Sequence, residues 1–157
     1  MTVVTISAAY GAGGSAIGPM VAEELGVPFL DRAIPVAVAE RLDVSEREAC
    51  ERDESVGCWM SRAVLAEHPT ALHVRLTGPL DARIEQAMAL GEADRGTAER
   101  LAEQADRARE AYVRHFYRAD ARHAEHYHLV LDSTALPLPA CTDLIVAAAQ
   151  ARQQARG

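Results

Sequence analysis

The clearest chemical signature in the sequence is a glycine-rich segment, A-A-Y-G-A-G-G-S at residues 8–15. It directly follows a short β-branched run at residues 2–7 and precedes a helical pattern. A loop of this composition points backbone N–H groups inward, and the helix after it adds its positive N-terminal end. The segment therefore predicts a phosphate-binding turn, although a purely structural strand-to-helix turn fits the same residues.

The segment matches neither common glycine motif in full. Against G-x-x-x-x-G-K-[ST] it keeps the second glycine, Gly13, and the hydroxyl residue, Ser15. Ala8 replaces the first glycine, however, and Gly14 replaces the lysine. Against G-x-G-x-x-G, Ala16 replaces the last glycine. The position of the segment immediately after the first predicted strand favours phosphate binding.

All 16 basic side chains are arginine, and the sequence contains no lysine. This composition excludes a Schiff-base lysine, a lysine general base and the usual phosphate-binding lysine of a P-loop. The net charge of −7 argues against nucleic acid or an anionic membrane surface as a partner. Residues 95–122 nevertheless carry seven arginines against five acids. Local handling of an anion and a solvated helix with internal ion pairs both fit this segment.

Apolar periodicity predicts strands that alternate with helices. The first helix is expected to end at Gly26, and Thr97 is expected to cap the long helix. In the helix at 80–90 the residues expected to face inward are Leu80, Ile84, Ala87 and Met88. Strands are predicted at 2–7, 27–31, 71–76 and 127–131, and further helices at 34–42, 97–117 and, after two interrupting prolines, 142–155.

This alternation indicates an α/β fold with three layers, α/β/α, around a parallel sheet with right-handed crossovers. The length of 157 residues and the lack of a long linker predict a single domain over 1–157. Cys50, Cys58 and Cys141 show no metal-type spacing, and Cys141 is expected in the core. Without a signal peptide or a long apolar span, the expected location is the cytoplasm.

Several longer segments of the sequence resemble a known family. V-T-I-S-x-x-Y-G-x-G-G-S-x-I-G, followed by L-G-V-P-F-L-D-R, resembles the opening of the cytidylate kinase-like family of P-loop proteins. Three later segments also match the family pattern: H-P-T-A-L-H-V-R-L-x-G-P-L-D-A-R-I, D-R-A-R-E-A-Y-V-R-H-F-Y and Y-H-L-V-L-D-S-T-A-L. The resemblance therefore covers residues 2–42 and about 62–150. It implies a P-loop NTPase-like fold and an enzyme that transfers phosphate from ATP, with Mg²⁺, to a nucleoside monophosphate, with CMP or dCMP expected.

The resemblance also implies roles for individual residues. Arginines suit phosphate because the guanidinium group grips its oxygens bidentately and stays charged. Arg107 and Arg114 are seven apart on one helical face, whereas Arg109 lies on another face, where a surface ion pair is the alternative. On this resemblance Asp31 and Arg32 face the acceptor, Arg83 contacts ATP, and residues 132–134 lie near the base of the donor nucleotide. Arg107, Arg109 and Arg114 belong to a closing lid within 95–122. The residues implied to cradle the donor phosphates, with Ser15 also binding Mg²⁺, are Gly11, Ala12, Gly13, Gly14, Ser15 and Ala16.

The sequence departs from the family pattern in two regions. The glycine turn has no basic side chain beside it. Any positive charge on the donor phosphates must therefore come from Mg²⁺, the helix N-terminus and the lid arginines. The acceptor-binding region at about 32–61 is short, as if it had lost one central strand. The sheet is then expected to re-pair its strands or to take the missing part from a second copy in a homodimer. Trp59, at the junction, either fills the gap or covers an interface.

These departures leave a second interpretation open, in which the chain is a catalytically degenerate nucleotide-binding or protein-interaction protein. Histidines can bind metals, and four of them lie close together in the sequence: His115, His123, His126 and His128. These histidines fall between a helix end and a strand, where alternate side chains diverge, so they are interpreted as polar loop residues rather than metal ligands.

Overall fold

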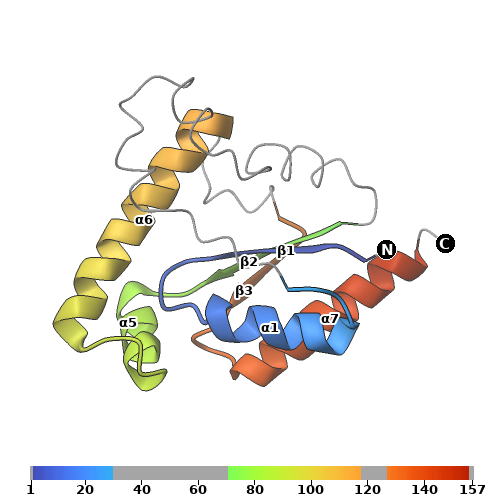
Figure 1. The fold of residues 1–157 in the computed structure, drawn as a ribbon, viewed down its shortest axis with the longest axis horizontal. Helices are drawn as coiled ribbons and strands as arrows, with labels where there is room; N and C mark the ends of the chain where they lie inside the picture. Colours follow the sequence, from blue (N-terminus) through green and yellow to red (C-terminus); the bar gives the residue numbers. More distant parts are fainter. Residues whose placement is uncertain (1, 30–70, 118–126, 156–157) are drawn as a thin grey trace.

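The structure is a computed structural model that describes residues 2–29, 71–117 and 127–155, with the backbone alone described at 108–117. Figure 1 shows strands and helices alternating along the chain. Asp31, Arg32, Cys50, Cys58 and Trp59 lie outside the described residues, as does the helix predicted at 34–42. The elements are β1 (Val4–Ala8), α1 (Gly14–Leu25), β2 (Leu72–Thr77), α5 (Leu80–Ala89), α6 (Arg95–Tyr117), β3 (Leu129–Asp132) and α7 (Leu138–Gln154).

The three strands form a parallel sheet in the order β1-β2-β3, which confirms the predicted α/β class. Val4 is in register with Leu72, and Val74 with Leu129. Parallel neighbours need helical crossovers, and α5 and α6 supply the connection between β2 and β3. Within the described ranges β1 pairs only with β2. The loss or re-pairing of a central strand stays a prediction, because the shortened region lies outside those ranges.

One face of the sheet carries the main core. Leu72, Val74 and Leu76 alternate along β2 and are buried, because β-strand side chains point to opposite faces in turn. Helices α1 and α7 pack side by side against this face (Figure 1). Small and aliphatic residues fill the interface, and the fully buried Cys141 is among them as expected.

The other face of the sheet is polar. Thr5 Oγ1 lies 2.7 Å from His73 Nδ1, and the rings of His73 and His128 stack with centroids 5.0 Å apart. Arg75 lies over the ring of Tyr127 at 5.7 Å. Parallel sheets usually bury apolar side chains on both faces, so this polar face is unusual. Of the four clustered histidines between residues 115 and 128, only His128 has a described side chain.

The ends of two helices test the capping predictions. The expected end of α1 is confirmed, with Gly26 N–H donating to Glu23 O and Val27 N–H to Ala22 O in a Schellman motif. Thr97 as cap of α6 is wrong, because its N–H and hydroxyl both donate to the Asp94 carboxylate at 3.0 Å. These bonds, the backbone one first, hold the pKa of Asp94 below its usual range. The helix therefore begins at Arg95.

Helix α7 begins at Leu138, not at residue 142, so the prediction that two prolines interrupt the chain there is wrong. Pro139 lies in the first turn, where a backbone N–H has no helical partner and its absence costs little. Part of the predicted strand at 27–31 is also not found, since residues 27–29 are irregular.

Helix α5 packs against α6 through a second, smaller core of Ile84, Ala87, Ala98 and Ala102. Ile84 and Ala87 are buried as predicted, but Leu80 and Met88 are 49% and 39% exposed, so their predicted inward position is wrong. The reason is that α5 is covered by one helix of small side chains rather than enclosed, which leaves a narrow buried stripe. Within the described part of the chain, no helix is long and apolar enough to cross a bilayer.

Candidate functional site

The glycine turn connects β1 to α1 at the carboxyl end of the sheet, beside α5 and α6 (Figure 1). Ala9 N–H donates to Leu76 O, and Ala12 N–H donates back to Ala9 O at 3.0 Å, which closes the turn. Gly11 and Gly13 both have φ of 77°, a left-handed conformation that favours glycine. Gly13 is the N-cap of α1, so the helix starts directly from the turn as the sequence predicted.

Three consecutive carbonyls of this turn accept hydrogen bonds from side chains of the scaffold. Tyr10 O accepts from Arg83 Nη1 at 2.9 Å, and Gly11 O accepts from Gln86 Nε2 at 2.9 Å. Ala12 O accepts from the buried Ser133 hydroxyl. We refer to Arg83, Gln86 and Ser133 as the loop-anchoring residues.

This arrangement sets the direction of the N–H groups in the turn. All described peptide bonds are trans, so each carbonyl points opposite to the N–H of the next residue. Because the carbonyls of Tyr10 and Ala12 face the scaffold, the N–H groups of Gly11 and Gly13 face the opposite side. At the start of α1 the N–H groups of Gly14 and Ser15 have no partner inside the helix, whereas that of Ala16 donates to Gly13 O at 3.1 Å. The turn therefore has the donors of an anion cradle.

At two glycines of the turn, neighbouring atoms lie so close that a side chain has no room. A Cβ at Gly11 would lie 2.1 Å from the backbone oxygen of Arg83. A Cβ at Gly14 would lie 2.5 Å from the Cβ of Ala8. The two departures from the P-loop motif, Ala8 for glycine and Gly14 for lysine, are therefore coupled, because the methyl group of one occupies the space that the other would need.

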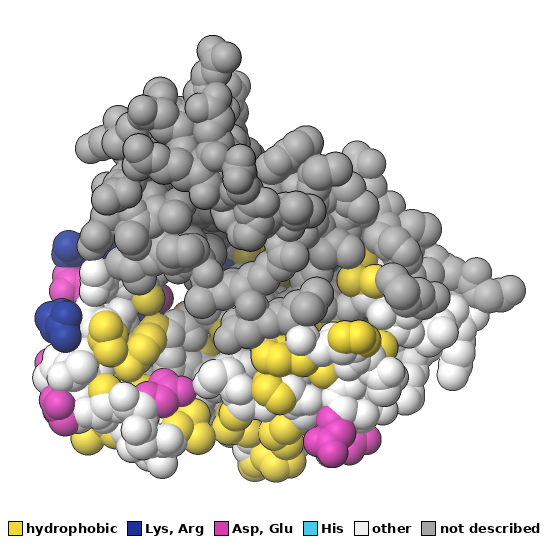
Figure 2. All heavy atoms as spheres, in the orientation of Figure 1, with side chains coloured by type: hydrophobic (Ala, Val, Ile, Leu, Met, Phe, Trp, Pro, Cys, Tyr) yellow, Lys and Arg dark blue, Asp and Glu magenta, His cyan; other side chains and the backbone are white. Residues whose placement is uncertain are grey.

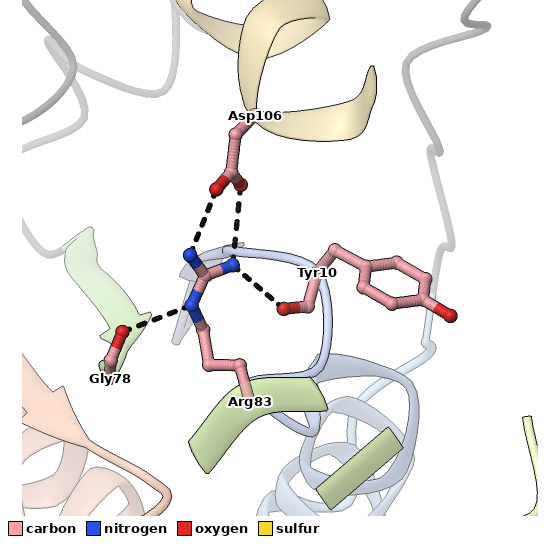
Figure 3. A network of polar contacts seen from close by, with 4 residues as sticks. All are labelled: Tyr10, Gly78, Arg83 and Asp106. Atoms are coloured by element: carbon pink, nitrogen blue, oxygen red, sulfur yellow. Dashed lines mark hydrogen bonds and ion pairs between the residues drawn. The ribbon is translucent and has the colours of Figure 1, made fainter. Parts of the chain in front are cut away.

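Figure 3 shows the guanidinium group of Arg83 between three parts of the chain. Its Nε donates to Gly78 O at 3.0 Å, and its two terminal nitrogens lie 3.3 and 2.8 Å from the carboxylate oxygens of Asp106 on α6. The side chain of Arg83 is 8% exposed and that of Asp106 is 39% exposed. Arg83 thus joins the glycine turn, the start of α5 and α6, and Asp106 balances its charge.

Ser15 lies in the first turn of α1, and its hydroxyl donates to the carboxylate of Glu92 at 3.1 Å. Both side chains are exposed. Nearby, the Tyr10 hydroxyl is buried without a hydrogen-bond partner. Burial, followed by the negative charge of Glu92, raises the pKa of Tyr10. A hydroxyl and a carboxylate oxygen are donors that Mg²⁺ prefers, and adjacent ligands on an octahedral Mg²⁺ are about 3 Å apart, so the pair fits the ion predicted at Ser15.

The segment after β3 is fixed by Asp132. Its Oδ1 accepts from Thr134 Oγ1 at 2.6 Å, from Thr134 N–H at 3.0 Å and from Ala135 N–H at 3.1 Å. These bonds, the hydroxyl first, lower the pKa of Asp132. The rigid turn presents the Ser133 hydroxyl to Ala12 O. The position of a donor base near residues 132–134 stays a prediction.

The structure brings together only some of the predicted site residues. The glycine turn, Arg83 and residues 132–134 meet at one end of the sheet. Arg107 lies on the outer face of α6, where it is 76% exposed and paired with Glu103. In Figure 2 arginine and acidic side chains lie next to each other at the left, where α6 is placed. Arg109 and Arg114 belong to α6, but their side chains are outside the described part.

Sequence reasoning missed Gln86, Glu92 and Asp106 as residues around the turn. Gln86 follows Arg83 by three positions, and residues at this spacing share a helical face. That spacing was a usable signal for a second side chain directed at the turn. Glu92 and Asp106 had no such signal, because only the fold brings them to Ser15 and Arg83.

A parallel sheet whose first strand leads through a glycine turn into a helix is a feature of nucleotide-binding α/β proteins, those with a P-loop-like fold included. Among these, the sequence matches the cytidylate kinase-like family over residues 3–63 and 51–135. The chain therefore belongs to the cytidylate kinase-like family, a family of nucleotide kinase-like proteins.

One solved structure supports the fold. A crystal structure of an uncharacterized protein from Eubacterium ventriosum ATCC 27560 superposes with a TM-score of 0.72 and 18% sequence identity. The superposition covers 96% of this chain and 99% of that chain. At this identity the likeness shows the fold alone. No curated protein matches the sequence.

Proposed function

We propose that this chain is an ATP-dependent nucleoside monophosphate kinase with CMP or dCMP as the acceptor. The observation that carries the proposal is the hydrogen bonding of the Tyr10 and Ala12 carbonyls to the scaffold, which turns the N–H groups of Gly11 and Gly13 away from it. A backbone cradle of this kind suits the phosphates of a nucleotide in a chain without lysine. Membership of the cytidylate kinase-like family supports the same reaction class.

The reaction asks little covalent chemistry of the protein. An oxygen of the acceptor monophosphate attacks the γ-phosphorus of ATP, and the bond from that phosphorus to the β–γ bridging oxygen breaks. The products are a nucleoside diphosphate and ADP, and the β-phosphate of ADP takes the electron pair. Because the attacking phosphate oxygen is already ionised at neutral pH, no general base is needed. The protein must hold both phosphates in line and balance their charge.

The described residues can supply part of this. The N–H groups of the turn and the N-terminus of α1 would bind the donor phosphates. Ser15 and Glu92 would hold Mg²⁺, which when bound neutralises charge on those phosphates. Arg32 and Asp31 at the acceptor, with Arg107, Arg109 and Arg114 as lid residues, complete the proposal from the sequence.

A second candidate function is nucleotide binding or protein interaction without catalysis. One observation favours it: Asp106 already neutralises Arg83, the arginine that contacts the turn, at 2.8 Å. With no lysine in the chain, transfer would then depend on Arg32 and on the arginines proposed for the lid.

The test is to incubate the purified chain with ATP, Mg²⁺ and a panel of nucleoside monophosphates and to measure diphosphates by chromatography. CMP or dCMP should give product. Gly13→Val should abolish it, because a β-branched side chain at φ of 77° would meet Leu138 Cδ2 at 2.8 Å and Gln86 Nε2, which holds the turn, at 3.2 Å. Arg114→Ala should reduce turnover if it is a lid residue. Gly26→Val is the matched control, since Gly26 also has positive φ but has no atom within 4 Å of an added Cβ.

The outcomes separate the two candidates. Diphosphate formation that survives in Gly26→Val and disappears in Gly13→Val supports the kinase. Binding of ATP without turnover of any monophosphate supports the second candidate. Absence of both binding and turnover would show that neither the kinase nor nucleotide binding without catalysis is right.

A further inference from the structure

We infer that Arg83 and Gln86 are positioning residues of the phosphate cradle, and that Asp106 on α6 acts through Arg83 to hold the cradle in shape. This rests on the proposed function, since it assumes that the turn binds phosphate. It differs from the prediction that Arg83 contacts ATP directly.

The hydrogen bonds of Arg83 carry the first step. Its Nε and Nη1 donate to the carbonyls of Gly78 and Tyr10, at 3.0 and 2.9 Å, and the two terminal nitrogens face the Asp106 carboxylate. A guanidinium group has five N–H donors in a fixed plane, and this plane is used mainly by backbone and carboxylate oxygens. With a side chain 8% exposed, Arg83 is placed as part of the scaffold.

Gln86 carries the second step independently of charge. It lies one helical turn after Arg83 on α5, and its Nε2 donates to Gly11 O at 2.9 Å. The two side chains therefore hold neighbouring carbonyls, those of Tyr10 and Gly11. The backbone of α5 also limits the turn, because Arg83 O leaves no room for a Cβ at Gly11. A neutral side chain in this place cannot serve as a counter-charge for phosphate.

Asp106 can distinguish the two possible roles of Arg83. The two roles predict opposite effects on nucleotide binding when the charge of Asp106 is removed. If Arg83 binds phosphate directly, Asp106 competes with the nucleotide, and Asp106→Asn should strengthen binding. If Arg83 positions the turn, Asp106 fixes the guanidinium plane, and Asp106→Asn should weaken binding although it removes a negative charge. The sign of the change decides between the roles.

The experiment measures binding of ATP and of inorganic tripolyphosphate, each with Mg²⁺, by calorimetry on the full chain. Asp106→Asn and Gln86→Met should each weaken binding of both probes by about five- to tenfold, which is the size of one or two hydrogen bonds. Arg83→Lys should weaken it as much as Arg83→Met, because a point charge cannot replace the planar fork. Glu99→Gln is the control, since Glu99 is an exposed acid of α6 paired with Arg95.

A second readout does not depend on any ligand. In the unliganded protein, the amide ¹H and ¹⁵N resonances of Gly11 and Gly13 should shift in Asp106→Asn and in Gln86→Met, but not in Glu99→Gln. A residue with only a general structural role would lower the melting temperature without this selective shift. Gln86→Met also keeps the test valid if Asp106→Asn folds poorly.

The failures are distinguishable. Tighter ATP binding by Asp106→Asn, or unmoved glycine resonances in both variants, overturns the positioning role while the proposed function stands. A wild-type chain that binds neither ATP nor tripolyphosphate overturns the proposed function and this inference with it.

Discussion

Two of the arginine–carboxylate pairs that involve α6 differ in what surrounds them. Arg83 reaches Asp106 from α5, is buried, and also binds the carbonyls of Tyr10 and Gly78. Arg107 pairs with Glu103 within α6, on an exposed face. The first pair joins three segments distant in sequence, whereas the second joins neighbouring turns of one helix. The same two residue types therefore connect distant segments in one place and neighbouring turns of an exposed helical face in the other.

The largest expected effect tests the contact between the turn and α5. Gly11→Ala places a Cβ 2.1 Å from a backbone oxygen, at φ of 77°. It should lower the free energy of unfolding by about 4 kcal/mol, of which about 1 kcal/mol is the conformational cost at positive φ. Urea denaturation measures the change.

Gly91→Ala is the matched control for Gly11→Ala. Gly91 has a similar φ of 74°, but nothing lies within 4 Å of an added Cβ. It should cost only the conformational part, about 1 kcal/mol. Equal losses at the two glycines would contradict the close approach of α5 to the turn.

The next effect compares the two arginines directly. Arg83→Met should destabilise the fold by about 3 kcal/mol, because it leaves the Tyr10 and Gly78 carbonyls and the partly buried Asp106 carboxylate without a donor. Arg107→Met should change stability by less than about 0.5 kcal/mol, as expected for an exposed i,i+4 pair. Thermal and urea denaturation of both variants provide the measurement, and similar values would remove the distinction drawn above.

A smaller effect tests the coupling of Ala8 with Gly14. Gly14→Ala alone should destabilise by about 2 kcal/mol, because its Cβ would lie 2.5 Å from that of Ala8. Ala8→Gly should relieve most of this loss, so the double-mutant cycle should give a coupling of about 1–2 kcal/mol. Additive effects would show that the two positions do not share space. Ala8→Gly with Gly14→Lys, which restores the P-loop pattern, should then tighten ATP binding.

The carboxylate of Asp94, at the start of α6, should make the stability of the fold depend on pH in a definite direction. Hydrogen bonds from Thr97 lower the pKa of Asp94, so the folded state binds its proton more weakly than the unfolded state does. The stabilisation is present above the ordinary pKa of about 3.9 and is lost as the pH falls through the lower folded value. Asp94→Asn, which keeps a capping oxygen but no charge, should make the melting temperature less sensitive to acid below pH 4. Asp143→Asn, at an exposed position of α7, is the control, and equal sensitivity of both variants would contradict the cap.

The smallest effect is expected at Tyr10. Its hydroxyl is buried without a partner, so Tyr10→Phe breaks no hydrogen bond and should leave stability within about 1 kcal/mol of wild type or slightly above it. Ultraviolet titration should show that the tyrosine of raised pKa is lost in the variant. A loss larger than about 1.5 kcal/mol would show that the hydroxyl is bonded after all.

Much of the fold could be predicted because the signals are local. The strand, glycine turn and helix at residues 2–25 follow from β-branched residues, glycine and a 3.6-residue apolar period. The errors arose where two local signals compete, as at Asp94 and Thr97, either of which can cap a helix. At α5 the error had another cause, because the exposure of Leu80 and Met88 depends on how much of the helix its partner covers.

By itself the sequence determined the order of elements, the family resemblance and a lysine-free glycine turn, since each is a property of neighbouring residues or of composition. Only the tertiary structure decided what Arg83 does. Its partners are 73 residues away at Tyr10 and 23 away at Asp106, and no spacing rule connects positions so distant. The same holds for Gln86 and Gly11, and for Ser133 and Ala12. Chain neighbours dictate the turn, but packing between α5, α6 and the end of β3 dictates which way its peptide groups point.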